Sequence, residues 1–62
     1  SPMDYFNQLK VQRACQYLDL TNLKIKEISF MLGFRDQFYF SKVFKKYMEM
    51  TPVDYKKRAD IE

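Results

Sequence analysis

The sequence predicts an all-α protein built as a small helical bundle. Three observations support this fold class. Apolar residues recur at helical spacing along most of the 62 residues, both prolines stand where helices are expected to begin, and the single glycine stands where one should end. No strand pattern competes with them. With 47% hydrophobic residues the chain is expected to fold, although a domain of this size is only marginally stable.

The first helix is expected to begin at Pro2 and to occupy residues 1–19. The Ser1 hydroxyl can accept a free backbone N–H, proline needs no N–H at the first helical position, and Asp4 favours the positive helix end. Apolar residues then continue at near-helical spacing as far as Leu18, and the stretch LTNLK interrupts them.

The second and third helices are separated by a short turn. The second is expected over about 25–32, and Gly33 should end it as a left-handed C-cap. Asp36 is a good N-cap for the third, which should span about 36–48. The inward-facing positions of the two helices are Ile25, Ile28 and Leu32, and then Phe40, Phe44 and Tyr47.

Two short helices joined around one glycine are typical of a helix-turn-helix. In that unit the first helix braces the second, which can lie in the DNA major groove. A plain helical bundle with a short turn is the alternative. The net charge of +3 favours an anionic ligand, but a lysine-rich solvated face would carry the same charge.

The fourth helix is expected to begin at Thr51–Pro52, within a stretch that repeats the start of the chain. TPVDY at residues 51–55 matches SPMDY at residues 1–5 in hydroxyl, proline, apolar residue, aspartate and tyrosine. Helix-start chemistry alone explains the first four positions, whereas the tyrosine is less easily explained that way. Chance and the duplication of a longer unit both remain open from this evidence.

Several function classes are disfavoured by composition. With no histidine and one cysteine, Cys15, the chain offers no zinc-ligand cluster and no internal disulfide. A single glycine cannot form a phosphate-cradling loop, and no histidine base is available. We therefore expect no enzyme, metal site or cofactor. No apolar run is long enough for a membrane span, so we expect a cytoplasmic protein.

A family resemblance covers nearly the whole chain. The run IKEISFMLGFRDQFYFSKVFKKYMEMTPVDYKKR resembles the second helix-turn-helix of AraC-type bacterial transcription regulators, whose pattern includes I-x-E-I-A, G-F-x-D, Y-F-S-R-x-F-K-K and T/S-P-x-x-Y. The opening SPMDYFNQLKVQRACQYL resembles the linker helix of the same family. The resemblance implies a homeodomain-like fold with a linker helix at residues 1–19 and a helix-turn-helix unit at residues 24–62. It also explains the repeat, because each of the family's two units is followed by an S/T-P helix start. The first unit is then expected to be absent from this chain.

The resemblance implies sequence-specific binding of double-stranded DNA, with the helix at about 36–48 as the recognition helix. Its N-terminal residues would reach base edges and its flanks would reach phosphates. The expected base contacts are Gln37, Phe38, Ser41 and Lys42. The expected phosphate contacts are Tyr39, Lys45, Lys46 and Arg35. The Gln37 amide suits adenine, whereas Phe38 could touch a thymine methyl or pack sideways into the protein.

Departures from the family pattern limit this transfer. Lys42 replaces arginine and so loses bidentate recognition. Glu49 stands where glycine usually closes the recognition helix, and a left-handed glutamate costs about 1 kcal/mol, so we expect a reshaped cap. Ser29 replaces a small alanine and should fit.

A helical protein–protein interaction module is the rival function, in which Phe6, Phe38 and Tyr39 would meet a partner protein. RNA polymerase is one protein partner that is compatible with DNA binding. Tyr5, Phe6 and Leu9 are expected to be exposed when no first unit covers them. An apolar patch of this kind predicts dimerisation or domain swapping through residues 3–18.

Overall fold

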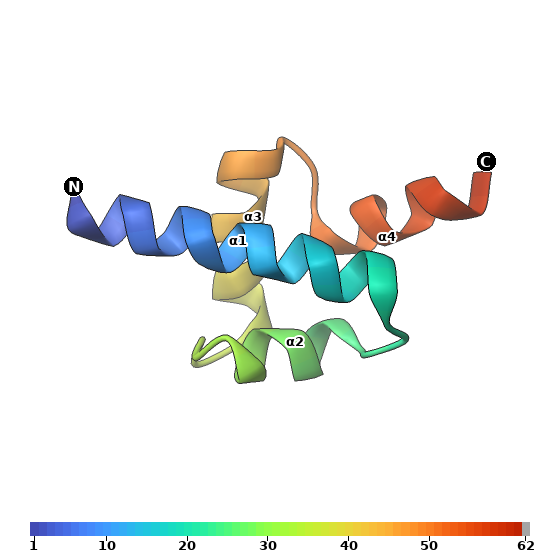
Figure 1. Ribbon diagram of the computed structural model, residues 1–62, viewed down its shortest axis with the longest axis horizontal. Helices are drawn as coiled ribbons and strands as arrows, with labels where there is room; N and C mark the ends of the chain where they lie inside the picture. Colours follow the sequence, from blue (N-terminus) through green and yellow to red (C-terminus); the bar gives the residue numbers. More distant parts are fainter. Residues whose placement is uncertain (62) are drawn as a thin grey trace.

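The computed structural model describes the backbone of residues 1–61 and the side chains of residues 1–59. It consists of helices α1 (Pro2–Leu20), α2 (Ile25–Met31), α3 (Gln37–Met48) and α4 (Pro52–Ile61). Within this described part no strand is present, which confirms the all-α prediction. Figure 1 shows α1 along the length of the molecule, with α3 crossing behind it, α2 below it and α4 near its C-terminal end.

Both predicted proline starts are confirmed, and they have the same local geometry. The Ser1 hydroxyl accepts the Asp4 N–H at 3.4 Å, and the Thr51 hydroxyl accepts the Asp54 N–H at 3.2 Å. Each motif therefore caps its own helix through side-chain chemistry that lies within the pentapeptide.

The turn between α2 and α3 also follows the sequence prediction. Gly33 has a φ of 88°, and its N–H donates to the Phe30 carbonyl at 3.0 Å. The Phe34 N–H donates to the Ser29 carbonyl at 3.0 Å, which completes a Schellman motif. Asp36 then caps α3 by accepting the Tyr39 N–H at 2.8 Å. These bonds fix how α3 leaves α2.

An aromatic row forms the centre of the core. Phe40 and Phe44 on α3 are fully buried, with ring centroids 5.9 Å apart. Phe34 continues the row on one side at 5.2 Å from Phe40, and Tyr55 of α4 continues it on the other at 5.7 Å from Phe44. The inward face predicted for α3 is therefore confirmed at Phe40 and Phe44, while Tyr47 is half-buried against the core. Val11 of α1 is also in the core at 1% exposure, although the sequence analysis did not assign it there.

The C-terminal part of α1 is joined to α4 by a polar contact. The Tyr55 hydroxyl donates to one Asp19 carboxylate oxygen at 3.0 Å, and the Arg58 guanidinium lies 3.1 Å from the other. The guanidinium also stacks over the Tyr55 ring at 3.9 Å. Cys15, nearby on α1, is half-buried, and burial raises the pKa of its thiol.

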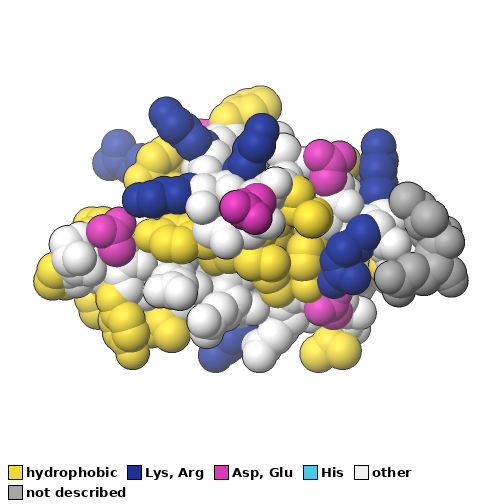
Figure 2. All heavy atoms as spheres, turned by 90° about the horizontal axis from the view of Figure 1, so that it is seen from above, with side chains coloured by type: hydrophobic (Ala, Val, Ile, Leu, Met, Phe, Trp, Pro, Cys, Tyr) yellow, Lys and Arg dark blue, Asp and Glu magenta, His cyan; other side chains and the backbone are white. Residues whose placement is uncertain are grey.

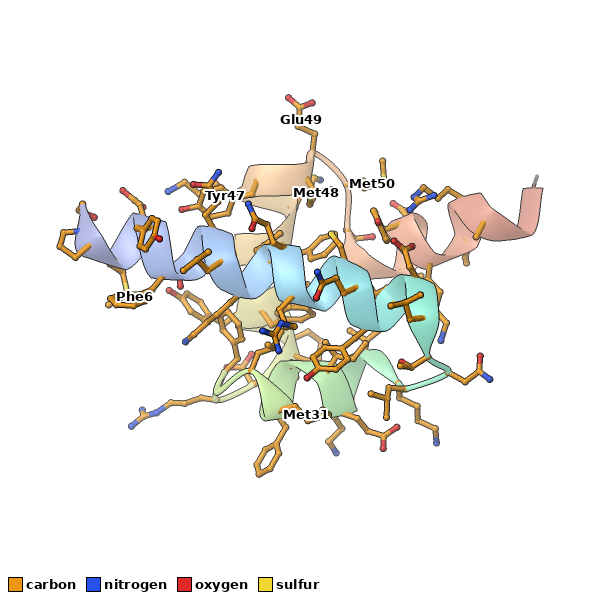
Figure 3. The ribbon with its side chains drawn as sticks, viewed as in Figure 1. Phe6, Met31, Tyr47, Met48, Glu49 and Met50 are labelled. Atoms are coloured by element: carbon orange, nitrogen blue, oxygen red, sulfur yellow. The ribbon has the colours of Figure 1, made fainter. Side chains whose placement is uncertain are left out.

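The expectation of a reshaped cap at the end of α3 is wrong. Glu49 adopts the left-handed conformation with a φ of 63°, and its N–H still donates to the Lys45 carbonyl at 2.9 Å. The chain reaches the Thr51 cap of α4 only two residues later, so it must reverse here whatever the residue type. Figure 3 shows the Glu49 side chain projecting away from the bundle.

The N-terminal end of α1 exposes apolar side chains. Tyr5 is 61% exposed, Phe6 57% and Leu9 42%, which confirms the exposure that the sequence analysis expected. Figure 2 shows hydrophobic side chains gathered at this end of the molecule, and Figure 3 shows Phe6 pointing away from the other helices. We call Met3, Tyr5, Phe6 and Leu9 the N-terminal apolar patch.

Candidate nucleic-acid interface

The outward face of α3 carries one exposed aromatic side chain and two exposed lysines. Phe38, Lys42 and Lys45 follow one another at i, i+4 and i+7, opposite the buried Phe40 and Phe44. Phe38 is 79% exposed, so it does not pack sideways into the protein. We call Phe38, Lys42 and Lys45 the outer face of α3.

One flank of this face meets α2. Gln37 and Ser41 are half-buried there, one turn apart on α3. A hollow of about 290 Å³ separates the start of α3 from α2, and Phe30 forms part of its wall with 80% of its surface exposed. The hollow is lined by Lys26, Ser29, Phe30, Phe34, Arg35, Asp36, Gln37 and Phe38. Phe30 was not among the contact residues predicted from the sequence, although its offset from the inward positions of α2 was a usable signal.

The opposite flank of α3 meets the N-terminal half of α1. The Tyr39 ring lies 6.0 Å from the Phe34 ring and remains half-exposed. The Lys46 ammonium lies 3.3 Å from the Asp4 carboxylate. The Tyr47 hydroxyl, from the next residue, lies 3.2 Å from the Asp4 carbonyl, and Figure 3 shows Tyr47 beside α1.

The Asp4–Lys46 pair shifts both pKa values in the directions expected for an ion pair. The hydrogen bond from Lys46, with a smaller one from Ser1, lowers the pKa of Asp4. The same hydrogen bond raises the pKa of Lys46. Both side chains remain more than half exposed, so the pair is screened by solvent. Lys46 would have to loosen its contact with Asp4 to reach a phosphate fully.

The other predicted cations differ from Lys46 in their surroundings. Within the described part of the chain, Arg35, Lys42 and Lys45 make no ion pair, and all three are exposed. Figure 2 shows Lys and Arg side chains gathered along the upper edge of the face in view. The structure thus places all eight predicted contact residues on α3 or its leading turn: five are exposed, Gln37 and Ser41 are half-buried, and Lys46 is engaged by α1.

This arrangement combines the groups that duplex recognition needs. An amide, a hydroxyl and an ammonium stand on the first two turns of α3, and cations stand on the turn and farther along the helix. In known recognition helices, the first turns are the part that reads base edges. Among the described residues, no group of acidic or cysteine side chains could hold a metal ion. None of the described helices is both long and apolar enough to cross a membrane.

Comparison with known proteins gives a consistent assignment. The Helix-turn-helix domain family matches residues 1–58. The MmsAB operon regulatory protein of Pseudomonas aeruginosa is 34% identical over 59 residues, which cover 95% of this chain and 19% of that protein. The raffinose operon transcriptional regulatory protein RafR of Pediococcus pentosaceus is 36% identical over 61 residues, covering 98% of this chain and 22% of that protein.

A third relative differs in size and name. Histidine kinase P4 of Formosa agariphila is 34% identical over 58 residues, which cover 94% of this chain and 4% of that protein. The chain spans about a fifth of the length of the two regulators and far less of the kinase. No solved structure shows a significant match. Taken with the fold and the basic outer face of α3, these matches show that the chain belongs to the AraC-type helix-turn-helix family of bacterial, DNA-binding transcription regulators.

Proposed function

We propose that this chain binds double-stranded DNA by inserting the N-terminal half of α3 into the major groove. The observation that carries the proposal is the outer face of α3, where exposed lysines and an exposed aromatic ring stand on a helix braced by a buried aromatic row. A solvated surface does not require a 79%-exposed phenylalanine, whereas a thymine methyl offers that ring an apolar contact.

The individual roles follow from position on the helix. Gln37, Phe38, Ser41 and Lys42 are proposed to contact base edges, because they occupy the first two turns of α3. Arg35, Tyr39, Lys45 and Lys46 are proposed to contact phosphates from the turn and the flanks. Lys42 offers one cationic donor group where an arginine would offer a fork, so its discrimination among bases should be weaker.

We further propose that residues 1–19 form a linker helix, that residues 24–62 form the helix-turn-helix unit, and that α1 packs against a second such unit. The repeated pentapeptide supports this arrangement. Tyr55 packs at 5.7 Å against Phe44 of the unit that precedes it and is 8% exposed. Tyr5 stands at the same place in its motif and is 61% exposed. A preceding unit would cover Tyr5 as the observed unit covers Tyr55.

The proposed function requires neither catalysis nor a cofactor, and we further propose that the protein acts in the cytoplasm, where bacterial DNA lies. A second candidate function is the docking of a partner protein such as RNA polymerase. The exposure of Phe30 at 80% and Met31 at 52% favours it, because both lie on α2 outside the outer face of α3. The two surfaces adjoin, because Phe30 lines the same hollow as Gln37 and Phe38.

A salt titration of DNA binding tests the proposal. Fluorescence anisotropy with a labelled mixed-sequence duplex should give a Kd of about 10⁻⁴–10⁻⁶ M near physiological salt. The affinity should fall as the salt concentration rises. Lys45→Met should lower the slope of log K against log salt by about one. Gln37→Ala should instead reduce discrimination between duplexes and leave the slope nearly unchanged.

The matched control is Arg13→Met, which removes one positive charge from α1. Arg13 lies in a hollow that contains no α3 residue. An equal loss of slope in Lys45→Met and Arg13→Met would mean that net charge, and not the outer face of α3, determines binding. No binding at low salt would reject the DNA-binding function and favour the protein partner.

A further inference from the structure

Two adjoining hollows run along the edge of α3 that faces α1. The first has a volume of about 440 Å³, and its wall combines Asn7 and Lys10 of α1 with Arg35 of the turn and Tyr39 of α3. The second has a volume of about 360 Å³ and is lined by Asn7, Tyr39, Lys42, Val43 and Lys46. Asn7 and Tyr39 line both, so the two hollows form a continuous edge to which α1 contributes.

Lys10 is held at the start of this edge by an aromatic contact. Its ammonium lies 5.0 Å from the centre of the Phe34 ring, and a Cβ on Gly33 would lie 3.9 Å from it. Among the described residues no ion pair or hydrogen bond engages the ammonium. The cation–π contact therefore positions the charge and leaves its hydrogen-bond donors available.

The edge is cationic once every charged group on it is counted. Lys10, Arg35, Lys42 and Lys46 line the two hollows, and Asp36 is the one carboxylate among the lining residues. Asp36 already accepts the Tyr39 N–H at 2.8 Å as the N-cap of α3. Asp4 lies beyond the lining and is paired with Lys46. Arg35 and Lys42 are unpaired in the described part of the chain.

A helix that lies in the major groove has one phosphate strand along each side. The edge of α3 next to α1 must then face one of these strands. We propose that Lys10 and Asn7 of α1 complete a phosphate-binding edge with Arg35 and Tyr39, so that α1 contacts the DNA backbone directly. The Lys10 ammonium, the Asn7 amide and the Tyr39 hydroxyl are all donors suited to phosphate oxygens. This inference rests on the proposed insertion of α3 into the groove.

The consequence is that α1 sets the orientation of the recognition helix. Phosphate contacts carry little sequence information but fix the register of a protein on the duplex. Contacts from two crossing helices fix more of that orientation than contacts from α3 alone. Lys10 and Asn7 are thus positioning residues for the base contacts proposed on α3.

The test compares neutral variants on the same helix. Lys10→Met keeps most of the aliphatic stem that packs near Phe34 but removes the charge. Arg13→Met removes one charge from a hollow that no α3 residue lines. With the labelled mixed-sequence duplex, Lys10→Met should lower the slope of log K against log salt by about 0.9. Arg13→Met should leave the slope unchanged, and Lys10→Arg should retain the wild-type slope.

A second pair covers the possibility that Lys10→Met disturbs folding, which circular dichroism would reveal. Asn7→Asp places a carboxylate inside the proposed edge, and Gln16→Glu places one on the same helix outside it. Asn7→Asp should weaken binding of every duplex, whereas Gln16→Glu should have a much smaller effect. Equal effects within both pairs would overturn the role of α1. If Lys45→Met still lowers the slope in that case, the proposed function stands without this inference. If the wild-type chain fails to bind at low salt, both are overturned.

Discussion

At the residue scale, two phenylalanines on α3 show how position decides role. Phe44 is fully buried between Phe40 and Tyr55, whereas Phe38, six positions earlier, is 79% exposed. Helical periodicity separates the two, because Phe44 shares a face with Phe40 and Phe38 does not. The same side chain is therefore a core residue at one position and a candidate DNA contact at the other.

This contrast predicts different costs for the same truncation. Phe44→Ala should destabilise the chain by about 3–5 kcal/mol, because it removes a buried aromatic side chain and leaves a cavity. Phe38→Ala should change stability by less than about 0.5 kcal/mol, since the ring is largely in solvent already. Thermal melts of the two variants measure both values. A loss below about 1 kcal/mol for Phe44→Ala would contradict the assigned core.

Glu49 is a second residue whose conformation leads to a prediction. Its φ of 63° is unfavourable for any side chain with a Cβ, and its carboxylate lies at the negative end of α3. Glu49→Gly should raise stability by about 0.5–1 kcal/mol, because relief of the strain exceeds the added entropy of the unfolded chain. Glu49→Ala is the control for charge, and in a thermal melt it should recover only a few tenths of a kcal/mol. Equal gains in both variants would show that charge, and not φ, limits this cap.

At the element scale, the described side chains show a separate polar contact from α1 to each of α3 and α4. Near its N-terminus, Asp4 meets Lys46 and Tyr47 of α3, and near its C-terminus Asp19 meets Tyr55 and Arg58 of α4. Between them, Val11, Ala14 and Leu18 pack into the core. Polar contacts therefore hold α1 at both ends, against α3 at one end and against α4 at the other.

The Asp4 contact predicts a pH dependence. The lowered pKa of Asp4 contributes stability above its ordinary value of 3.8, and this contribution is lost as the pH falls through the lowered pKa. The raised pKa of Lys46 contributes stability at pH values below the ordinary pKa of 10.5. This stability is lost as the pH rises through the raised pKa. The melting temperature of Asp4→Asn should therefore be lower than that of wild type at neutral pH and approach it in strong acid. In a Lys46→Met background most of that difference should vanish, and a full difference there would contradict the pair.

At this scale, the local features of the fold could be predicted from the sequence. Ser1, Thr51, Gly33 and Asp36 each act within a few residues of themselves, so helix starts and the central turn could be predicted from neighbouring residues alone. The outer face of α3 could be predicted for the same reason, since it follows from helical spacing.

The remaining features depend on how the helices cross. Periodicity does not show that Lys46 meets Asp4, that Asp19 meets Tyr55, or that Lys10 lies over Phe34, because these partners are far apart in sequence. The conformation of Glu49 was mispredicted for a related reason. A local cost of about 1 kcal/mol was outweighed by the need to reverse the chain between α3 and α4.

At the scale of the whole molecule, the distribution of apolar surface is uneven. The molecule measures 36 × 21 × 18 Å, and the N-terminal apolar patch lies at one end of its long axis. Contiguous exposed apolar surface of this kind commonly marks an interaction site. In the arrangement proposed above, a preceding unit would cover this patch by packing on Tyr5 as Phe44 packs on Tyr55.

In the isolated chain this patch predicts self-association through residues 3–18. Sedimentation velocity should show dimers at high protein concentration, and Phe6→Glu should shift the population to monomer by placing a charge within the contact. Leu20→Glu is the control, because Leu20 is 82% exposed but lies outside the patch. A monomer at every concentration would reject self-association through this surface.

The claim that α3 enters the major groove is tested most directly by mapping backbone amide shifts of the labelled chain during titration with a duplex. We expect the largest shifts at residues 35–46 of the turn and α3, a second set at Asn7 and Lys10 of α1, and small shifts along α4. Insertion of α3 into the groove would be contradicted if the amides of α3 did not shift and the largest shifts occurred at the N-terminal apolar patch or at Phe30 and Met31.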